Sequence, residues 1–262
     1  PVAGTVVSVV VSLLSLSIIS SFLTQKYGTV KNWRMLPCAM WLVFCIYLDS
    51  FLFVFATAVL KFGLGLDSSY AVCDGAILLC LVAYISTKVE WLLQLIYSFL
   101  AEKAYIIRGG LKSRMESKLW LFNTFGMLGA YTVVIILNFV FRIARFDEGE
   151  CVIGMERRAL LPLITFDLVL NVYLTLLFLI PVTALHSFRI KQRTQRRTEI
   201  HRMAVRTFFG SMCTLTSSIV NLSVLTVLNG EPGWLCLLCC NSDVLFSALM
   251  VHWVTSHDHI GS

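Results

Sequence analysis

Charged residues are scarce in this sequence: they make up 14% of its 262 residues, whereas a soluble protein carries about 25%. Hydrophobic residues account for 58% of the chain, and its mean hydropathy is +0.81. A chain with so few charges cannot cover a water-exposed surface, and its apolar residues fall into long blocks. These blocks predict an integral membrane protein.

The sequence also lacks features that mark other classes of protein. No Pro-rich or low-complexity stretch divides it, so we expect a single domain over residues 1–262. No glycine-rich phosphate-binding loop occurs. No lysine follows Lys191, which excludes a retinal Schiff base in the last apolar block and therefore an opsin. The first residue is Pro1 and not methionine, so we expect the sequence to be part of a longer chain.

Seven apolar stretches are each long enough to cross a bilayer as a helix, which takes about 20 residues. They cover roughly residues 2–24, 36–60, 71–100, 119–141, 159–185, 203–228 and 234–255. The predicted fold class is therefore an all-α membrane protein, built as a bundle of seven transmembrane helices.

The connecting loops differ in positive charge, which predicts the orientation of the bundle. Loops one, three and five hold 14 Lys and Arg residues, whereas loops two, four and six hold 5. Short cytosolic loops are enriched in these residues. We therefore expect the N-terminus outside and the C-terminus in the cytosol. The net charge of +6 is then an orientation signal and does not indicate a nucleic-acid partner.

Two of the nine cysteines stand apart from the rest. Cys73 is expected at the outer end of the third helix, and Cys151 lies in the acidic fourth loop. Both face the oxidising side, where a disulfide persists. We predict a disulfide between them, with two unpaired thiols as the alternative. Others, such as Cys45, Cys80 and Cys213, read as ordinary small apolar residues.

Seven helices, this orientation and the pair Cys73–Cys151 resemble the G-protein-coupled receptor superfamily. The resemblance implies a multi-pass receptor of the plasma membrane. The chain departs from the rhodopsin-like class, because Tyr97-Ser98-Phe99 replaces the acidic-Arg-aromatic triplet and the last helix lacks Asn-Pro-x-x-Tyr. The activation switches of that class therefore do not carry over.

The chain is also similar to a group of uncharacterised fungal seven-helix membrane proteins. The residues that carry this similarity are Ile164–Asp167, Pro181, Gly230–Trp234 and His252–Ser256. The similarity implies a fungal plasma-membrane protein and names no ligand.

Ionisable residues inside a span cost about 2.5–3.5 kcal/mol on insertion scales and should face the bundle interior with a partner. Asp49, Lys88 and Glu90 lie deep in the second and third spans. Lys88 and Glu90 point to different sides of their helix, so we expect Asp49 as the partner of Lys88, with Asp243 as the alternative. Such a network suits either an ion or proton relay or a purely structural contact.

A second polar set lies in the outer halves of the later spans. Its members are Asp167, Asn171, Asn221, Asn241 and Asp243. They predict an acidic, outward-facing site for a cationic or polyhydroxyl extracellular ligand, or for a coupling cation. The alternative is a set of hydrogen bonds between helices, each contributing about 0.6 kcal/mol.

The fifth loop is strongly basic and is expected in the cytosol. It carries Arg189, Lys191, Arg193, Arg196 and Arg197. Such a cluster binds anionic lipid headgroups, docks a heterotrimeric G protein as in the receptors that the chain resembles, or only sets the orientation.

A stripe of small residues in the first span, Gly4, Ser8 and Ser12, predicts close helix packing. A homodimer seam is the alternative. Four histidines and one aspartate are expected near the cytosolic face: His186, His252, His257, His259 and Asp258. Such residues bind catalytic metals, so a membrane metal hydrolase is a further hypothesis.

Three functions follow from these features, in order of preference. The first is a receptor that senses a small molecule or peptide. The second is a transporter or relay that uses Asp49, Lys88 and Glu90. The third is the membrane hydrolase. For the preferred reading we expect no catalytic residue, no metal and no cofactor.

Overall fold

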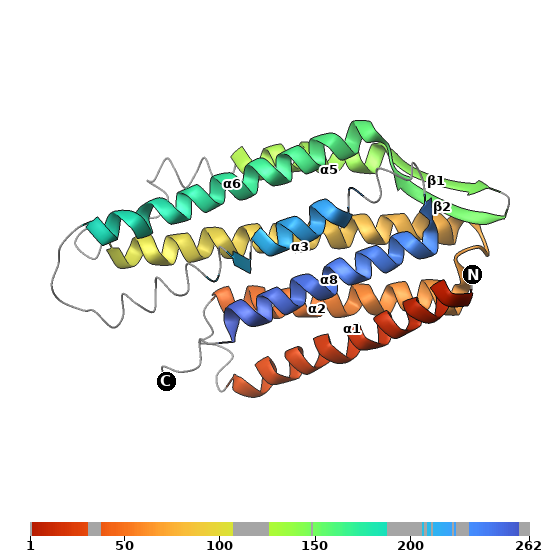
Figure 1. Cartoon of the computed structure of the whole chain (residues 1–262), viewed down its shortest axis with the longest axis horizontal. Helices are drawn as coiled ribbons and strands as arrows, with labels where there is room; N and C mark the ends of the chain where they lie inside the picture. Colours follow the sequence, from red (N-terminus) through yellow and green to blue (C-terminus); the bar gives the residue numbers. More distant parts are fainter. Residues whose placement is uncertain are drawn as a thin grey trace.

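The computed structural model describes residues 2–30, 38–106, 126–147, 149–187, 206, 209–210, 212–221, 223 and 231–256. These residues are mostly helical and form an elongated bundle (Figure 1). The helices with assigned bounds are α1 (Val2–Thr29), α2 (Cys38–Ala58), α3 (Tyr70–Ile106), α5 (Met127–Val140), α6 (Arg157–Ser187) and α8 (Gly233–Thr255). Residues 212–221 are also helical.

Four of the described helical stretches are long and apolar enough to cross a membrane. They are Gly4–Gly28, Met40–Gly65, Tyr70–Thr87 and Gly233–Thr255. Between 22% and 39% of the most apolar window of each is buried, so most of their apolar side chains face outward, as lipid contact requires. The chain is therefore a membrane protein. The count of seven spans and the orientation stay predictions.

The first and last of these helices run in the same direction (Figure 1). Near their starts, a Cβ atom on Gly4 would lie 2.8 Å from the ring of Trp234. At their ends, Lys26 of α1 donates a hydrogen bond to the carbonyl oxygen of Thr255 in α8, at 3.0 Å. Because the two helices are parallel, a chain that spans the bilayer with both must cross it an odd number of times between them. The predicted topology meets this condition.

The fourth loop, for which no strands were predicted, is a β-hairpin, so the protein is mostly helical but not purely so. β1 (Arg142–Asp147) pairs antiparallel with β2 (Glu150–Met155), and the turn contains Gly149 at φ +87°. A short third strand, β3 (Glu231–Pro232), pairs with β2 just before α8 begins. We call this end of the bundle the hairpin end (Figure 1).

The second span is longer than predicted, because α2 continues directly into a π-helix, η2 (Val59–Gly65). Gly65 has a φ of +75°, which a side chain would strain, and the helix ends there. Lys61, expected in the second loop, therefore lies within the membrane-length stretch Met40–Gly65. Its ammonium contacts the hydroxyl of Ser8 and lies 5.7 Å from the ring centre of Trp234.

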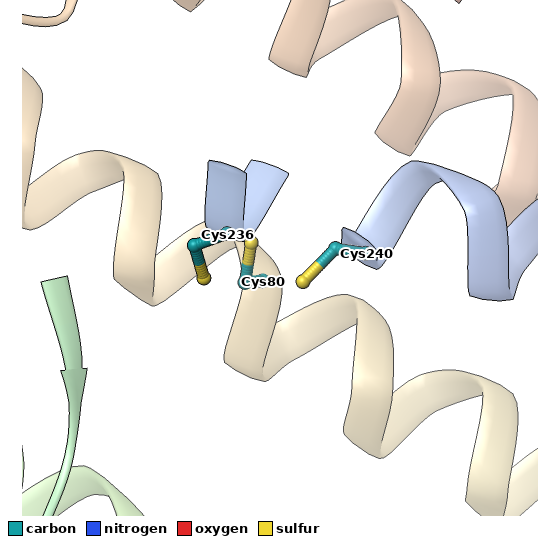
Figure 2. Close-up of side chains that lie close together, drawn as sticks. All are labelled: Cys80, Cys236 and Cys240. Carbon is teal, nitrogen blue, oxygen red and sulfur yellow. The ribbon is translucent and has the colours of Figure 1, made fainter. Parts of the chain in front are cut away.

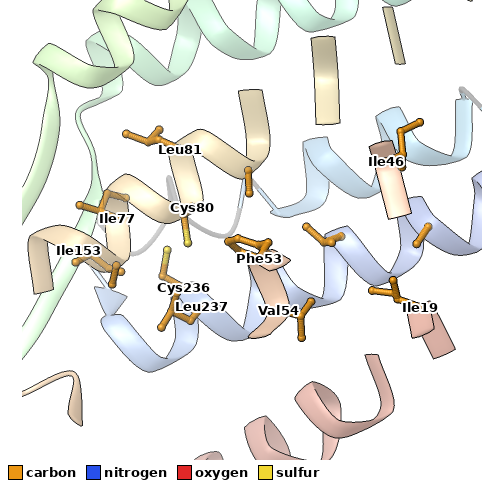
Figure 3. Packing of buried hydrophobic residues seen from close by; sticks show 14 of the residues in the cluster. Ile19, Ile46, Phe53, Val54, Ile77, Cys80, Leu81, Ile153, Cys236 and Leu237 are labelled. Atoms are coloured by element: carbon orange, nitrogen blue, oxygen red, sulfur yellow. The ribbon is translucent and has the colours of Figure 1, made fainter. Parts of the chain in front are cut away.

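The main apolar core lies between α1, α2, α3, α8 and strand β2 (Figure 3). Ile19, Val54, Ile153 and Leu237 are each at most 1% exposed within it. A smaller cluster joins α5 to α6 through Val134, Leu160 and Leu163. The hairpin therefore contributes to the same core as the membrane helices.

The small-residue stripe of α1 is an internal packing face, as predicted. Ser8 is 3% exposed and Ser12 is 4% exposed, and α1 packs on α2 and α8. A homodimer therefore has to use other residues. Lys26, counted above among the loop charges, is buried at 4% exposure, where its charge faces the negative end of the α8 helix dipole.

Gly233 marks the closest approach between α8 and the hairpin. A Cβ atom there would lie 2.4 Å from Leu66 Cδ2 and 3.1 Å from Cys151 Sγ. Gly233→Ala is therefore expected to destabilise the protein by about 1–3 kcal/mol, the usual cost of overpacking. Thermal unfolding in detergent measures the loss.

Gly75→Ala is the matched control, because nothing lies within 4 Å of its Cβ position in α3. Alanine favours a helix by about 1 kcal/mol over glycine, so this variant should be neutral or more stable. Equal melting temperatures for the two variants would contradict the close packing at Gly233.

Candidate functional site

A disulfide fastens the hairpin to the bundle and confirms the predicted pair. Cys73 and Cys151 are joined with an S–S distance of 2.01 Å and a Cα–Cα distance of 5.7 Å. Both residues are at most 1% exposed. The backbone N–H of Cys151 also donates to Asp67 Oδ1 at 2.8 Å. Strand β2 is therefore held at the start of α3 by one covalent bond and one hydrogen bond to a carboxylate.

An ion pair, absent from the sequence-based predictions, holds the base of the hairpin. Arg142 donates from Nε to Asp74 Oδ1 at 3.0 Å and from a terminal nitrogen to Asp74 Oδ2 at 3.3 Å. The hydrogen bond to Asp74 raises the pKa of the Arg142 guanidinium, so this side chain stays charged. Asp74 directly follows Cys73, so both links start from the same turn of α3.

Asp74→Asn removes the charge from this ion pair and keeps the shape of the side chain. We expect the amides of β1 to exchange with deuterium faster, while those of α8 stay unchanged. Hydrogen exchange read by mass spectrometry measures the difference. Glu150→Gln, an exposed charge change at the hairpin turn, is the control. Equal exchange in both variants would show that the ion pair does not restrain the hairpin.

A group of polar side chains from five helical segments meets inside the bundle around Tyr84. We call it the Tyr84 cluster, with members Tyr84, Tyr131, Asp167, Ser217, Ser218 and Asp243.

The first half of the Tyr84 cluster joins α3, α5 and α6. The hydroxyl of Tyr84 donates to Asp167 Oδ2 at 3.4 Å, and Asp167 is 7% exposed. The ring of Tyr131 stacks beside that of Phe166, with 5.8 Å between their centres. Tyr131 is within electrostatic range of Asp167. A buried carboxylate and two phenol hydroxyls thus lie close together.

The second half brings a further carboxylate from α8. Asp243 accepts hydrogen bonds from the hydroxyls of Ser217 at 2.6 Å and Ser218 at 3.4 Å. It also lies within electrostatic range of Tyr84. Asp167 and Asp243 therefore act on the same phenol from two different helices, which concentrates negative charge at one place in the interior.

Seven buried side-chain atoms of the described residues have no hydrogen-bond partner, and two of these atoms are relevant to the Tyr84 cluster. The two are the hydroxyl of Tyr131 and Oδ1 of Asn221. Asn221 follows Ser217 by four residues, so both point from the same face of their helix. Buried polar atoms without a partner are rare in folded proteins, and a bound water, ion or ligand is a common reason for them.

No protein-family model matches this chain, and no curated protein is significantly similar to it. The function of the chain is therefore inferred from the arrangement of its own residues.

The Tyr84 cluster lies well inside the bundle, below the hairpin end. Asp167 is ten residues into α6 (157 to 167), and Asp243 is ten residues into α8 (233 to 243). At 1.5 Å per residue both lie about 15 Å along their helices, near half the thickness of a bilayer core. Both helices start at the hairpin end (Figure 1). Both carboxylates also lie near Tyr84, which is consistent with a similar depth.

Of the five ligand-binding residues predicted from the sequence, the structure places two, Asp167 and Asp243, in this cluster. Asn221 lies one turn after Ser217 on the same helix, and its place in the site stays a prediction. Asn241 does not join them, because it is 5% exposed and accepts a hydrogen bond from Thr57 Oγ1 of α2 at 3.0 Å. Asn241 thus forms a hydrogen bond between two helices, which was the alternative to a ligand-binding role. The side chain of Asn171 lies outside the described residues.

Of the three residues in the predicted charge network, only Asp49 has a described side chain. Its carboxylate accepts a hydrogen bond from the Ser86 hydroxyl at 2.5 Å, which places α2 and α3 side by side at this depth. The side chains of Lys88 and Glu90 lie outside the described residues, so their pairing stays a prediction. The basic residues Arg189, Lys191, Arg193, Arg196 and Arg197 also lie outside them.

Among the described residues, no histidine belongs to a group of side chains with metal-ligand spacing. His252 stacks on Phe22 with 3.9 Å between ring centres. Buried Lys26, one turn from Phe22 on α1, is within electrostatic range of His252, and a cation there opposes metal binding. His257 and His259 lie outside the described residues. The structure therefore offers no support for this third reading.

Sequence reasoning missed all four hydroxyl groups of the Tyr84 cluster, because tyrosine and serine within apolar spans are common and carry no charge. It also missed that Cys80 meets Cys236 and Cys240. A signal for the second was available, since Cys236 and Cys240 are four residues apart and must share one face of the last helix.

Proposed function

We propose that this chain is a seven-helix receptor of the plasma membrane that binds a cationic extracellular ligand and signals to a heterotrimeric G protein. The observation that carries the proposal is the meeting of Asp167 and Asp243 around Tyr84, below a hairpin that a disulfide holds at the bundle end. The ligand would be a small amine or the cationic end of a peptide.

The charge of the Tyr84 cluster supports a cationic ligand. Two carboxylates in a low-dielectric interior attract an ammonium group strongly, and the faces of Tyr84 and Tyr131 add cation–π attraction. The Tyr131 hydroxyl and the Asn221 oxygen offer acceptors for its N–H groups. Few, well-placed polar groups among apolar walls are typical of small-molecule sites.

The hairpin supports binding from outside. Its strands carry the disulfide, the Asp67 contact and the Asp74 ion pair, so three separate links restrain it close to the helix ends. A restrained segment next to a site loses little conformational entropy when a ligand binds. The basic loop around Arg189–Arg197, predicted in the cytosol, would supply the surface for the G protein.

Nucleotide exchange on purified Gα subunits tests the proposal. The chain in lipid nanodiscs is mixed with a panel of Gα subunits and with primary amines, diamines or short basic peptides. Neutral alcohols of matched size are the controls. We expect at least one cation to accelerate binding of a GTP analogue and its alcohol to have no effect. No acceleration with any Gα subunit would refute the receptor function.

A proton or cation relay is the second candidate, favoured by the contact between Asp49 and Ser86 in the middle of the described bundle. In liposomes, a relay predicts an ion-dependent flux that Asp49→Asn or Lys88→Met abolishes. A protein without flux in its unmutated form removes this candidate.

A further inference from the structure

Three cysteines from two helices meet in the core, separate from the Tyr84 cluster. Cys80 lies on α3, and Cys236 and Cys240 lie one turn apart on α8 (Figure 2). Their three Sγ atoms all lie within 4.8 Å of one another. Cys80 is 6% exposed and Cys236 is 2% exposed. All three are thiols, unlike the disulfide-bonded Cys73.

The surroundings of these thiols are apolar. Phe53, Ile77, Leu81 and Leu237 belong to the same buried cluster as Cys80 and Cys236 (Figure 3). Among the described residues, this is the one group of three or more histidine, cysteine or carboxylate side chains with metal-ligand spacing. Sulfur is therefore the only kind of donor that the group presents.

We propose that Cys80, Cys236 and Cys240 bind a single soft monovalent metal ion, Cu(I), through their three sulfur atoms. Soft thiolate ligands select Cu(I) over hard cations such as Mg²⁺ and Ca²⁺. With a metal–sulfur distance of about 2.3 Å, as in zinc thiolates, three sulfurs around one ion lie about 4 Å apart. The observed spacing needs only small side-chain rotations to reach this arrangement.

The number of ligands separates Cu(I) from Zn²⁺. Three sulfurs complete a trigonal shell for Cu(I), whereas structural zinc takes four ligands in a tetrahedron. Cys239 is the nearest candidate for a fourth sulfur, but it does not share the close spacing of the other three. Each thiol that ligates as a thiolate releases its proton to the solvent, so metal binding should be weaker at low pH.

The position of the site gives it a structural consequence. Cys80 follows Cys73 by seven residues, so both lie on one face of α3, about 10 Å apart along the axis. The disulfide joins α3 to the hairpin, and the metal ion would join α3 to α8 two turns deeper. A ligand that binds only the folded state stabilises it, so Cu(I) should raise the melting temperature.

Competition for Cu(I) against a chromogenic chelator, under anaerobic and reducing conditions, tests the proposal on the full chain in detergent. We expect one Cu(I) per chain. Loss of a group that only orients a metal ligand costs about 10- to 100-fold in affinity, so Cys80→Ser, Cys236→Ser and Cys240→Ser should each cost roughly 100-fold or more. Cys213→Ser and Cys239→Ser should bind as the unmutated chain does.

X-ray absorption on the unmutated protein tests the same site without relying on variants that fold. Three sulfur neighbours and no nitrogen or oxygen support the proposal. Nitrogen or oxygen ligands, undiminished binding by the triple serine variant, or a disulfide among the three cysteines would each overturn it. A preference for Zn²⁺ over Cu(I) that is lost in Cys239→Ser would also overturn the proposal. None of these readouts depends on the proposed receptor function.

Discussion

Replacing Cys73 and Cys151 together by serine is expected to lower the free energy of unfolding by up to about 4 kcal/mol. The bond closes a loop whose ends are 78 residues apart. In the chain-entropy description, opening a loop of this length costs roughly 4–4.5 kcal/mol. Transmembrane helices stay largely formed within a bilayer, which limits the freedom that the open chain regains and makes this value an upper bound.

The disulfide also decides where the hairpin lies. Without it, the hairpin keeps the hydrogen bond of β2 to Asp67 and the Arg142–Asp74 ion pair at the base of β1. We therefore expect the hairpin to exchange its amides faster and the core helices to keep their protection. Thermal unfolding and hydrogen exchange measure the two effects.

Cys45→Ser and Cys213→Ser are the controls for the loss of the disulfide, because both cysteines are exposed and neither forms a disulfide. They should melt close to the unmutated protein. A double variant of Cys73 and Cys151 that melts at the same temperature as these controls would show that the bond contributes no stability.

The second large effect is expected at Asp167. Asp167→Asn keeps the shape of the side chain and a hydrogen-bond acceptor for Tyr84, but removes one of the two negative charges around that phenol. Removing one partner of a buried charge pair costs about 2–5 kcal/mol of binding. The potency of a cationic agonist should therefore fall roughly 30-fold or more, at 1.4 kcal/mol per tenfold.

The stability of the same variant separates a binding role from a structural one. Like charges near one another repel, and Asp167 and Asp243 both lie within electrostatic range of Tyr84. If they are there to bind a cation, Asp167→Asn should leave the melting temperature of the ligand-free protein unchanged or higher, as is common for residues kept for function. If they only hold helices together, the variant should melt lower and keep its agonist response.

Asp49→Asn is the matched control for Asp167→Asn, since it also neutralises a carboxylate within a span but lies outside the Tyr84 cluster. It should leave agonist potency unchanged under the receptor function. If it abolished an ion flux instead, the relay would replace the receptor as the preferred function.

Much of the fold was predictable, because the relevant signals are local. Long apolar runs placed the helices now seen as α1, α2, α3 and α8 to within a few residues at most ends. The pair Cys73–Cys151 was predictable, because Cys73 lies at the outer end of an apolar run and Cys151 lies in a loop on the same side of the membrane. The π-helix η2 and the hairpin were missed, because a segment with charged residues at the end of an apolar run indicates a loop until its backbone hydrogen bonds are known.

The candidate sites were less predictable for the same reason. Asp243 and Asn241 are two residues apart, yet one meets Ser217 and the other meets Thr57. Side chains turn about 100° per residue around a helix, so neighbours in sequence face different helices. Lys26 was counted among the loop charges that predict the orientation, whereas in the structure its ammonium donates a hydrogen bond to the last turn of α8.

By itself, the sequence determined that this protein enters a membrane, roughly where four of its apolar helices lie, and that Cys73 and Cys151 pair. These follow from hydrophobicity and cysteine position, which act over a few residues or one side of the bilayer. Only the tertiary structure decided that Asp167 and Asp243 share Tyr84 and that Cys80 meets Cys236 and Cys240. Those contacts join residues about 80 to 160 positions apart, and they depend on how each helix is rotated about its axis against its neighbours.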